Sequence, residues 1–184
     1  MRIATVEKPK GLFVRFAYWM CRRRLGKVVT PLKAVHARIP KTILVEYGIM
    51  RALEGGLSLD RGLQFLVQHQ VARINGCGFC IDIGRALALG YRVDLAKLEA
   101  LEQFRSDARF SERERSALAY VEEATRQKRV GDATFAALRR HFDDRQIAEI
   151  TWLCALENYF NLINLPLEIE SDGLCAIAER RRAA

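Results

Sequence analysis

The chain has 184 residues, of which half are hydrophobic and only four are proline, and its formal net charge is +8. This composition excludes a globally disordered chain and provides a core of ordinary size for one domain. The basic residues form short clusters without a groove-reading motif or stacking aromatic residues, so no nucleic-acid partner is expected.

The first 56 residues are expected to form a helical extension that packs on the core. An amphipathic helix is predicted over residues 12–24, a second one from Thr30-Pro31 through residue 37, and a third over residues 41–53. The apolar run at residues 12–20 is too short to span a membrane, and no signal-peptide cleavage site follows it. A cytoplasmic protein without membrane association is therefore expected.

Residues 57–184 are expected to form the core domain. Helical periodicity predicts helices over residues 60–74, 77–89, 93–104, 111–128, 132–142 and 143–164, and a short one after Ser171. The expected N-terminal capping residues are Asp60, Ser111 with Glu114 in a capping box, Asp132, Asp143 or Asp144, and Ser171. The predicted fold class is therefore a single all-α domain.

The cysteines point to one candidate site. Five cysteines, an odd number in a chain expected to be cytoplasmic, argue against a structural disulfide framework. Only Cys77 and Cys80 have a meaningful spacing, because a Cys-x-x-Cys pair at a helix start has both sulfurs on one face. The positive end of the helix dipole favours their thiolate forms. No second Cys/His pair supports zinc, so no metal or cofactor is expected.

The stretch around these cysteines resembles the alkylhydroperoxidase D-like branch of the carboxymuconolactone decarboxylase family. The resemblance runs from about Leu57 to Leu174 and rests on Ala72-x-x-Asn75-Gly76-Cys77-x-x-Cys80. The redox members of that family carry Glu-x11-Cys-x2-Cys-x3-His. This chain departs from the pattern at two positions, with Phe65 in place of the glutamate and Gly84 in place of the histidine.

The resemblance implies an AhpD-like fold, assembly as a homo-oligomer (trimer, hexamer or dimer), and peroxide chemistry. Cys80 would be the attacking sulfur, and Cys77 the proton donor and resolving partner. A hydroperoxide would be the substrate and an unidentified thiol the reductant. Because the usual acid and imidazole are missing, two alternatives stay open: thiol–disulfide exchange, and a non-catalytic helical oligomer that keeps the cysteines for packing.

Two residues are candidates for the missing proton relay. His69 lies on the same side of its helix as Phe65 and Ala72, and this stripe is expected to line the dithiol site, which makes His69 the leading substitute. The alternative is an interface or surface histidine. Glu157 is the second candidate, because it accompanies Asn158 and Asn161 on an apolar helix. These three form either a buried polar network or an exposed face.

Overall fold

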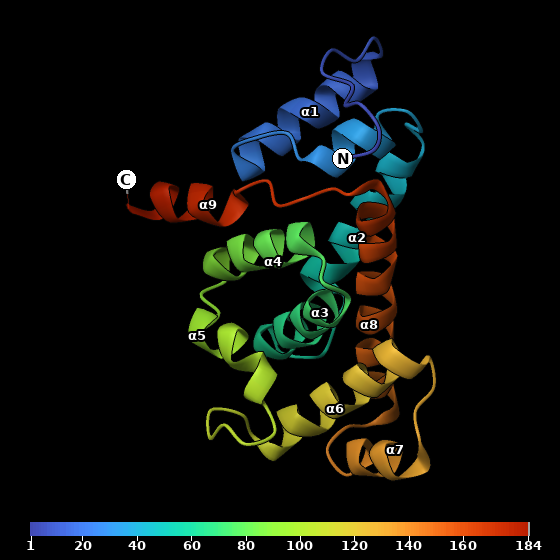
Figure 1. Ribbon diagram of the computed structural model, residues 1–184, viewed down its shortest axis with the longest axis vertical. Coiled ribbons are helices and arrows are strands. Elements are labelled where there is room, and N and C mark those ends of the chain that lie inside the picture. Colours follow the sequence, from blue (N-terminus) through green and yellow to red (C-terminus); the bar gives the residue numbers. More distant parts are fainter. Residues whose placement is uncertain (184) are drawn as a thin grey trace.

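Helix α3 (Arg61–Asn75) lies at the centre of the computed structural model, which describes residues 1–183, and other helices surround it (Figure 1). The α-helices before and after it are α1 (Leu12–Leu25), α2 (Thr42–Gly55), α4 (Gly78–Gly90), α5 (Leu95–Glu99), α6 (Glu112–Gln127), α7 (Asp132–Arg139), α8 (Asp144–Asn164) and α9 (Leu174–Ala183). Short π- and 3₁₀-helical segments are η1 (Leu32–His36), η2 (Ala100–Gln103) and η3 (Leu165–Leu167). The predicted all-α domain is confirmed.

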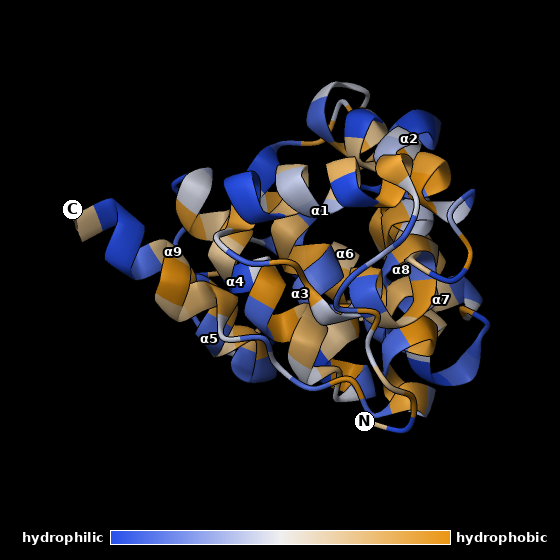
Figure 2. Ribbon diagram, turned by 90° about the horizontal axis from the view of Figure 1, so that it is seen from above, coloured by the Kyte–Doolittle hydropathy of each residue, from blue (hydrophilic) through white to orange (hydrophobic). Residues whose placement is uncertain are grey.

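Both sides of α3 are buried within the chain. One side packs Leu63, Val67 and Val71 into a cluster with apolar residues of α6, α7 and α8. The other side packs Leu66 against residues of α4, α5 and α6. Seen from above, hydrophobic and hydrophilic stretches alternate along α3 and α8, whereas the end of α9 near the C-terminus is hydrophilic (Figure 2). Because α3 is buried on both sides, it fixes the position of the cysteine-bearing turn that follows its last residue.

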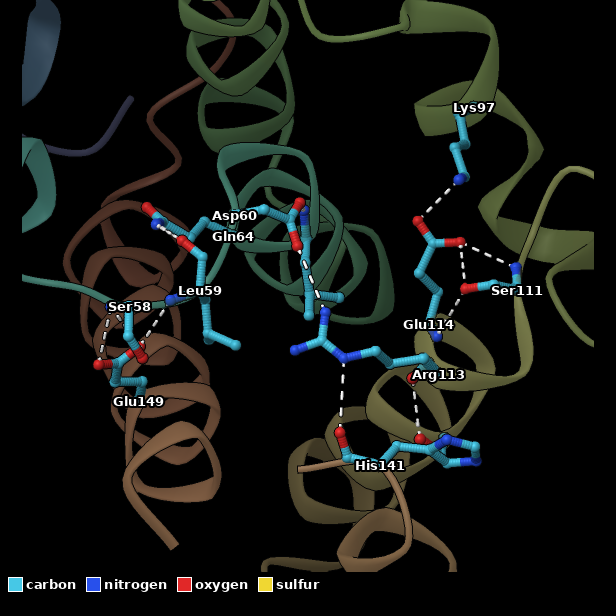
Figure 3. Close-up of polar contacts among 12 residues, drawn as sticks. Ser58, Leu59, Asp60, Gln64, Lys97, Ser111, Arg113, Glu114, His141 and Glu149 are labelled. Carbon is cyan, nitrogen blue, oxygen red and sulfur yellow. Dashed lines mark hydrogen bonds and ion pairs between the residues drawn. The ribbon is translucent and has the colours of Figure 1, made fainter. Parts of the chain in front are cut away.

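Local capping signals located three helix starts correctly. Asp60 accepts a hydrogen bond from the Leu63 backbone N–H, and Asp143 accepts one from Gln146. Ser111 and Glu114 form the expected capping box, and Lys97 approaches Glu114 from another helix (Figure 3). These caps satisfy backbone donors that the first turn of a helix leaves unpaired.

Two other expected caps are wrong. Asp132 is the first residue of α7 and Gly131 precedes it as the N-cap. Ser171 does not cap α9. Instead the Asp82 carboxylate of α4 accepts the backbone N–H groups of Leu174 at 2.8 Å and Cys175 at 2.9 Å. A carboxylate from a packed neighbouring helix has replaced the local serine because α9 lies along α4.

Two predicted helices are less regular than expected. Residues 30–37 contain a π-helical turn, in which the Ala37 N–H bonds to the Leu32 carbonyl at 2.9 Å. Thr30 does not cap this turn, because its backbone N–H and hydroxyl both bond to Asp172. The helix predicted over residues 93–104 is split into α5 and the 3₁₀ segment η2.

The N-terminal segment covers one end of the core. Tyr18 of α1 packs with Val14 and Val28 in a small cluster, and Arg2 N–H bonds to the Leu167 carbonyl at 2.9 Å. The division into residues 1–56 and 57–184 stays a prediction. Helix α2 buries none of its residues within the described chain, and it exposes Leu44 and Tyr47. The expected homo-oligomer also stays a prediction.

None of the helices described for residues 1–183 has the length and apolar character needed to cross a bilayer.

Candidate active site

A tight turn between α3 and α4 sets the position of the cysteine pair. Gly76 has φ +70° and ψ 28°, a left-handed conformation that favours glycine. The Cys77 N–H then bonds back to the Ala72 carbonyl at 2.9 Å. Cys77 is the N-cap of α4, and its sulfur accepts the Cys80 backbone N–H at 3.4 Å. The helix start therefore directs its unpaired donors at this sulfur.

The two sulfurs are buried and face one another. The Cys77 and Cys80 Sγ atoms lie 2.6 Å apart, which confirms that the spacing gathers them on one face. Cys77 is 0% exposed and Cys80 is 6% exposed. The sulfurs of a disulfide bond are separated by about 2.05 Å, so little movement separates this dithiol from a disulfide.

Asn164, the last residue of α8, completes the sulfur environment. Its side-chain Nδ2 lies 3.3 Å from the Cys80 Sγ and 3.9 Å from the Cys77 Sγ. Asn164 was not among the predicted site residues. The sequence does contain a pattern that could have identified it, because Glu157, Asn161 and Asn164 follow the i, i+4, i+7 spacing of one helix face.

The environment favours one thiolate shared by the pair. The pKa of the Cys77 thiol is lowered to about 7 by the hydrogen bond from Cys80, and further by the backbone N–H of Cys80 and the Asn164 amide, despite burial. The pKa of the Cys80 thiol is raised, because it donates to Cys77, is buried, and lies near the Glu157 carboxylate. Two groups this close titrate as a pair, with the first proton leaving near neutral pH.

Glu157 places a carboxyl group beside the dithiol. It is 7% exposed, and its Oε1 accepts a hydrogen bond from the Asn161 Nδ2 at 2.8 Å. Burial raises the pKa of Glu157 to about 8, although the hydrogen bond from Asn161 and a polar contact with the Cys80 thiol lower it in part. Glu157 is therefore mostly protonated at neutral pH, and it can donate a proton near the sulfurs.

A network of buried and half-buried amides holds this region together. Asn75, in the turn before Cys77, donates from Nδ2 to the Asn161 Oδ1 at 2.8 Å and to the Asn158 Oδ1 at 3.0 Å. Asn158 in turn donates to the Cys154 carbonyl at 2.9 Å. Glu157 and Asn161 are buried, so the interpretation as a polar network is confirmed and the exposed-face alternative is wrong.

His69 is buried beside Gly84. The imidazole is 5% exposed, so the alternative of a surface histidine is wrong for this chain. A Cβ atom at position 84 would lie 3.2 Å from the His69 Nδ1, which explains the glycine in this helix. Burial, followed by the charges of Arg73 and Arg85, lowers the pKa of His69 to about 4. Within residues 1–183, no hydrogen bond joins its ring to either sulfur.

The residues of α3 that were expected to line the dithiol pack in different places. Ala72 packs in the same cluster as Cys77 and Cys80. Phe65 instead contacts Tyr91, with ring centroids 5.7 Å apart, and packs against the cluster that contains Leu66. Phe65 therefore packs in a different cluster from the sulfurs, because about three turns of helix separate it from the cysteine-bearing turn. The structure thus brings Glu157, rather than the leading candidate His69, to the sulfurs.

Known proteins resemble this chain in sequence and in fold. The protein YnjA of Escherichia coli, which is uncharacterized, is 33% identical over 172 residues, 92% of this chain and 94% of its own. A cysteine-to-alanine variant of the debrominase Bmp8, in complex with 2,3,4-tribromopyrrole, superimposes with a TM-score of 0.81 at 15% identity, covering 98% of this chain and 97% of Bmp8. An uncharacterized peroxidase-related protein from Silicibacter gives a TM-score of 0.76 at 23% identity, covering 89% and 87%.

The sequence pattern of a family also matches part of the core. Residues 46–123 fit the model of the carboxymuconolactone decarboxylase family, and this range includes the cysteine pair and the helices on either side of it. Together with the AhpD-like fold and the relative that is aligned over nearly its whole length, the match shows that the chain belongs to the carboxymuconolactone decarboxylase family.

Proposed function

We propose that the protein reduces small hydroperoxides with the Cys77–Cys80 dithiol. One observation carries this proposal: two sulfurs 2.6 Å apart lie beside a carboxyl group whose pKa is raised to about 8. Peroxide reduction needs a thiolate, a second thiol and a proton for the departing alkoxide. Cys77, Cys80 and Glu157 supply these three groups.

In the first step a thiolate attacks the terminal oxygen of ROOH. An S–O bond forms, the O–O bond breaks, and the electron pair leaves with the alkoxide. Glu157 gives its proton to that alkoxide, so that ROH departs and the sulfur becomes a sulfenic acid. Such assistance contributes roughly 10²–10⁴-fold to the rate.

In the second step the other cysteine attacks the sulfenic sulfur. Its S–H proton and the sulfenic hydroxyl leave together as water, and a Cys77–Cys80 disulfide forms. The peroxide has then gained two electrons and the dithiol has lost two. A thiol reductant returns the disulfide to the dithiol by exchange.

Cys80 is the proposed attacking sulfur. The family resemblance assigns it this role, and it has the larger exposed fraction, 6% against 0% for Cys77. In the resting pair the hydrogen bond favours the thiolate at Cys77. A proton shift along the short contact between the sulfurs transfers the negative charge to Cys80 when substrate arrives.

The related proteins are consistent with this chemistry. The solved structures with this fold include an alkylhydroperoxidase AhpD core from Ralstonia eutropha, described as a peroxidase-related protein. Its sequence identity of 18% supports the fold, so the activity proposed for this chain rests on the arrangement of its own sulfurs and carboxyl group.

Stopped-flow oxidation of the reduced protein by hydrogen peroxide and by an organic hydroperoxide tests the proposal. We expect Cys80→Ser to abolish peroxide consumption, and Cys77→Ser to leave a sulfenic acid at Cys80 that dimedone traps. Cys154→Ser serves as a matched control and keeps the wild-type rate. Peptide mapping after oxidation should find the Cys77–Cys80 disulfide. Slow reaction with peroxides but fast reaction with disulfides would favour the thiol–disulfide exchange alternative.

Reductive debromination is a second candidate, favoured by the likeness to Bmp8 along almost the whole chain. A thiolate would take bromine from a bromopyrrole, and the carbanion would receive the Glu157 proton. The second thiol would then displace bromide and form the disulfide. Bromide release from a bromopyrrole, compared with peroxide consumption by the same preparation, separates the two candidates.

A further inference from the structure

The side-chain amide of Asn164 uses its N–H donor group but not its acceptor oxygen. Its Nδ2 approaches the Cys80 Sγ at 3.3 Å and the Cys77 Sγ at 3.9 Å. Its Oδ1 is buried and has no hydrogen-bond partner within the described residues. The residue as a whole is 2% exposed, so bulk water does not satisfy this oxygen.

The orientation of this amide follows from the charge on the sulfurs. A thiolate accepts hydrogen bonds, and N–H donors at a helix start and on Asn164 both point at the pair. Turning the amide over would direct its oxygen at a negatively charged sulfur and would remove that donor. The oxygen is therefore left without a partner as a consequence of stabilising the thiolate.

An unpaired buried acceptor is unusual in a folded protein and is costly to maintain. The amide geometry puts Oδ1 about 2.3 Å from Nδ2, and so within ~5.6 Å of the Cys80 sulfur. A peroxide group in contact with that sulfur spans this distance. A substrate that brings a hydrogen-bond donor beside the attacked atom would satisfy the oxygen.

We infer that Asn164 is a substrate-binding residue, whose Oδ1 accepts a hydrogen bond from the O–H of the hydroperoxide while its Nδ2 holds the attacking thiolate. This inference rests on the proposed function and names the substrate class of that site. The attacked oxygen carries the hydrogen, and it keeps that hydrogen as the S–O bond forms. The hydrogen bond therefore persists from the bound hydroperoxide to the sulfenic acid.

The Asn164 oxygen also predicts which oxidants the site binds poorly. Dialkyl peroxides and disulfides have no O–H or N–H at the reacting atoms, so they leave the Asn164 oxygen unpaired. Hydroperoxides with a free O–OH group satisfy it. A site with a buried polar group rejects a molecule that lacks the matching partner.

The experiment compares two small electrophiles that react with the same thiolate. Hydrogen peroxide carries O–H groups, whereas methyl methanethiosulfonate has no O–H or N–H. Rate constants for both are measured on the full-length wild type and Asn164→Leu at one pH, with mass spectrometry of the Cys77–Cys80 peptide as the readout. Because thiolate reactivity affects both rates, their ratio isolates recognition of the O–H group.

We expect the ratio of the peroxide rate to the methanethiosulfonate rate to fall about tenfold or more in Asn164→Leu, as for the loss of one buried hydrogen bond to substrate. Gln64→Leu is the control, because it also removes a buried amide, whose Nε2 donates to the Leu59 carbonyl at the opposite end of α3. The ratio should be unchanged in this control. An unchanged ratio in Asn164→Leu would overturn the inference.

A second variant, Asn164→Asp, tests the acceptor oxygen separately from the N–H donor. Aspartate is nearly isosteric with asparagine, so this variant also serves if Asn164→Leu folds poorly. It keeps an acceptor oxygen and loses the N–H donor. We expect its rate ratio to stay within about threefold of wild type, while the thiol pKa, followed by thiolate absorbance, rises. A ratio as low as expected for Asn164→Leu would contradict the acceptor role.

The same data distinguish this inference from the proposed function. A wild-type protein that reacts with hydrogen peroxide no faster than free cysteine contradicts both. Fast wild-type peroxide reduction with an Asn164-independent ratio contradicts the inference alone, and leaves the dithiol peroxidase standing.

Discussion

Glu149 and Glu157 stand about two turns apart on α8, and both are buried, with exposed fractions of 8% and 7%. Their ionisation differs. Burial acts to raise the pKa of Glu149, but hydrogen bonds from the Ser58 and Leu59 backbone and from Arg145 hold it below the usual value. Burial raises the pKa of Glu157 to about 8.

Two causes explain this difference: Glu157 lies deeper in the protein than Glu149, and Glu149 has more hydrogen-bond donors. The Glu149 carboxylate accepts the Ser58 N–H at 2.9 Å and hydroxyl at 3.0 Å, the Leu59 N–H at 3.0 Å, and the Arg145 guanidinium at 3.1 Å (Figure 3 shows the contacts with Ser58 and Leu59). Glu157 accepts one amide N–H, from Asn161. Two carboxyl groups with similar exposed fractions thus differ in role: Glu149 is a charged structural anchor near the protein surface, and the more deeply buried Glu157 keeps its proton.

The largest effect is expected when the retained proton is removed. Glu157→Gln should slow oxidation of the dithiol by hydrogen peroxide about 10²-fold or more, because the amide cannot protonate the leaving alkoxide. The fold should be retained, since glutamine resembles the protonated acid in shape and charge. Stopped-flow kinetics at pH 7 measure this, and a wild-type rate would remove Glu157 from the mechanism.

The matched substitution at the other carboxylate should affect stability instead. Glu149→Gln leaves an N–H group facing the donors of Ser58 and Leu59, and we expect it to cost about 1–3 kcal/mol of unfolding free energy. Urea denaturation measures this loss. The oxidation rate of the folded variant should equal that of wild type, and a large fall would mean that the two carboxylates do not have separate roles.

The pH dependence of stability sharpens the comparison. The folded-state pKa of Glu157, about 8, exceeds the ordinary value of 4.5, so the folded protein binds this proton more tightly than the unfolded chain. Its contribution is fully present below the unfolded value and is lost as the pH rises through the folded value. The slope from one proton is at most about 1.4 kcal/mol per pH unit.

The measurement is the difference in unfolding free energy between wild type and Glu157→Gln from pH 5 to 7. As the pH rises, the unfolding free energy of wild type should fall relative to that of Glu157→Gln. His69, whose pKa is lowered to about 4, acts in the opposite direction below its ordinary value of 6.5, but it is common to both proteins and cancels. A difference that is independent of pH would contradict the raised pKa of Glu157.

A small effect on the rate is expected at His69. Sequence reasoning makes it the leading relay, and a relay role predicts a fall of tenfold or more in His69→Ala. Because Glu157 is the group at the sulfurs, we expect less than about a threefold change at pH 7. The same stopped-flow assay decides between them, and a tenfold loss would return the relay to His69.

Local signals explain what the sequence could predict. The α3–turn–α4 unit and the gathering of Cys77 and Cys80 depend on residues close in the chain, above all Asn75-Gly76 and the Cys-x-x-Cys spacing. Caps at Asp60, Ser111 and Asp143 also act within a few residues. These predictions were correct because the interactions that determine them are short-range.

Long-range contacts account for the errors. Asp82 caps α9 from a separate helix, and Asn164 reaches the sulfurs from the far end of α8. Periodicity assigns Phe65 and His69 to one face of α3, but it does not say which neighbour each turn of that face meets. Those partners depend on how α4 and α8 cross α3, and this is a property of the assembled fold.

Gly84 and His69 have a consequence for how this site can change by single substitutions. A Cβ at position 84 would approach the His69 ring to 3.2 Å, so a histidine introduced there would compete for space that another imidazole already fills. The two positions are therefore mutually dependent. A side chain at position 84 is accommodated only if the His69 ring moves by a few tenths of an ångström or residue 69 becomes smaller, so a change at one position alters what fits at the other.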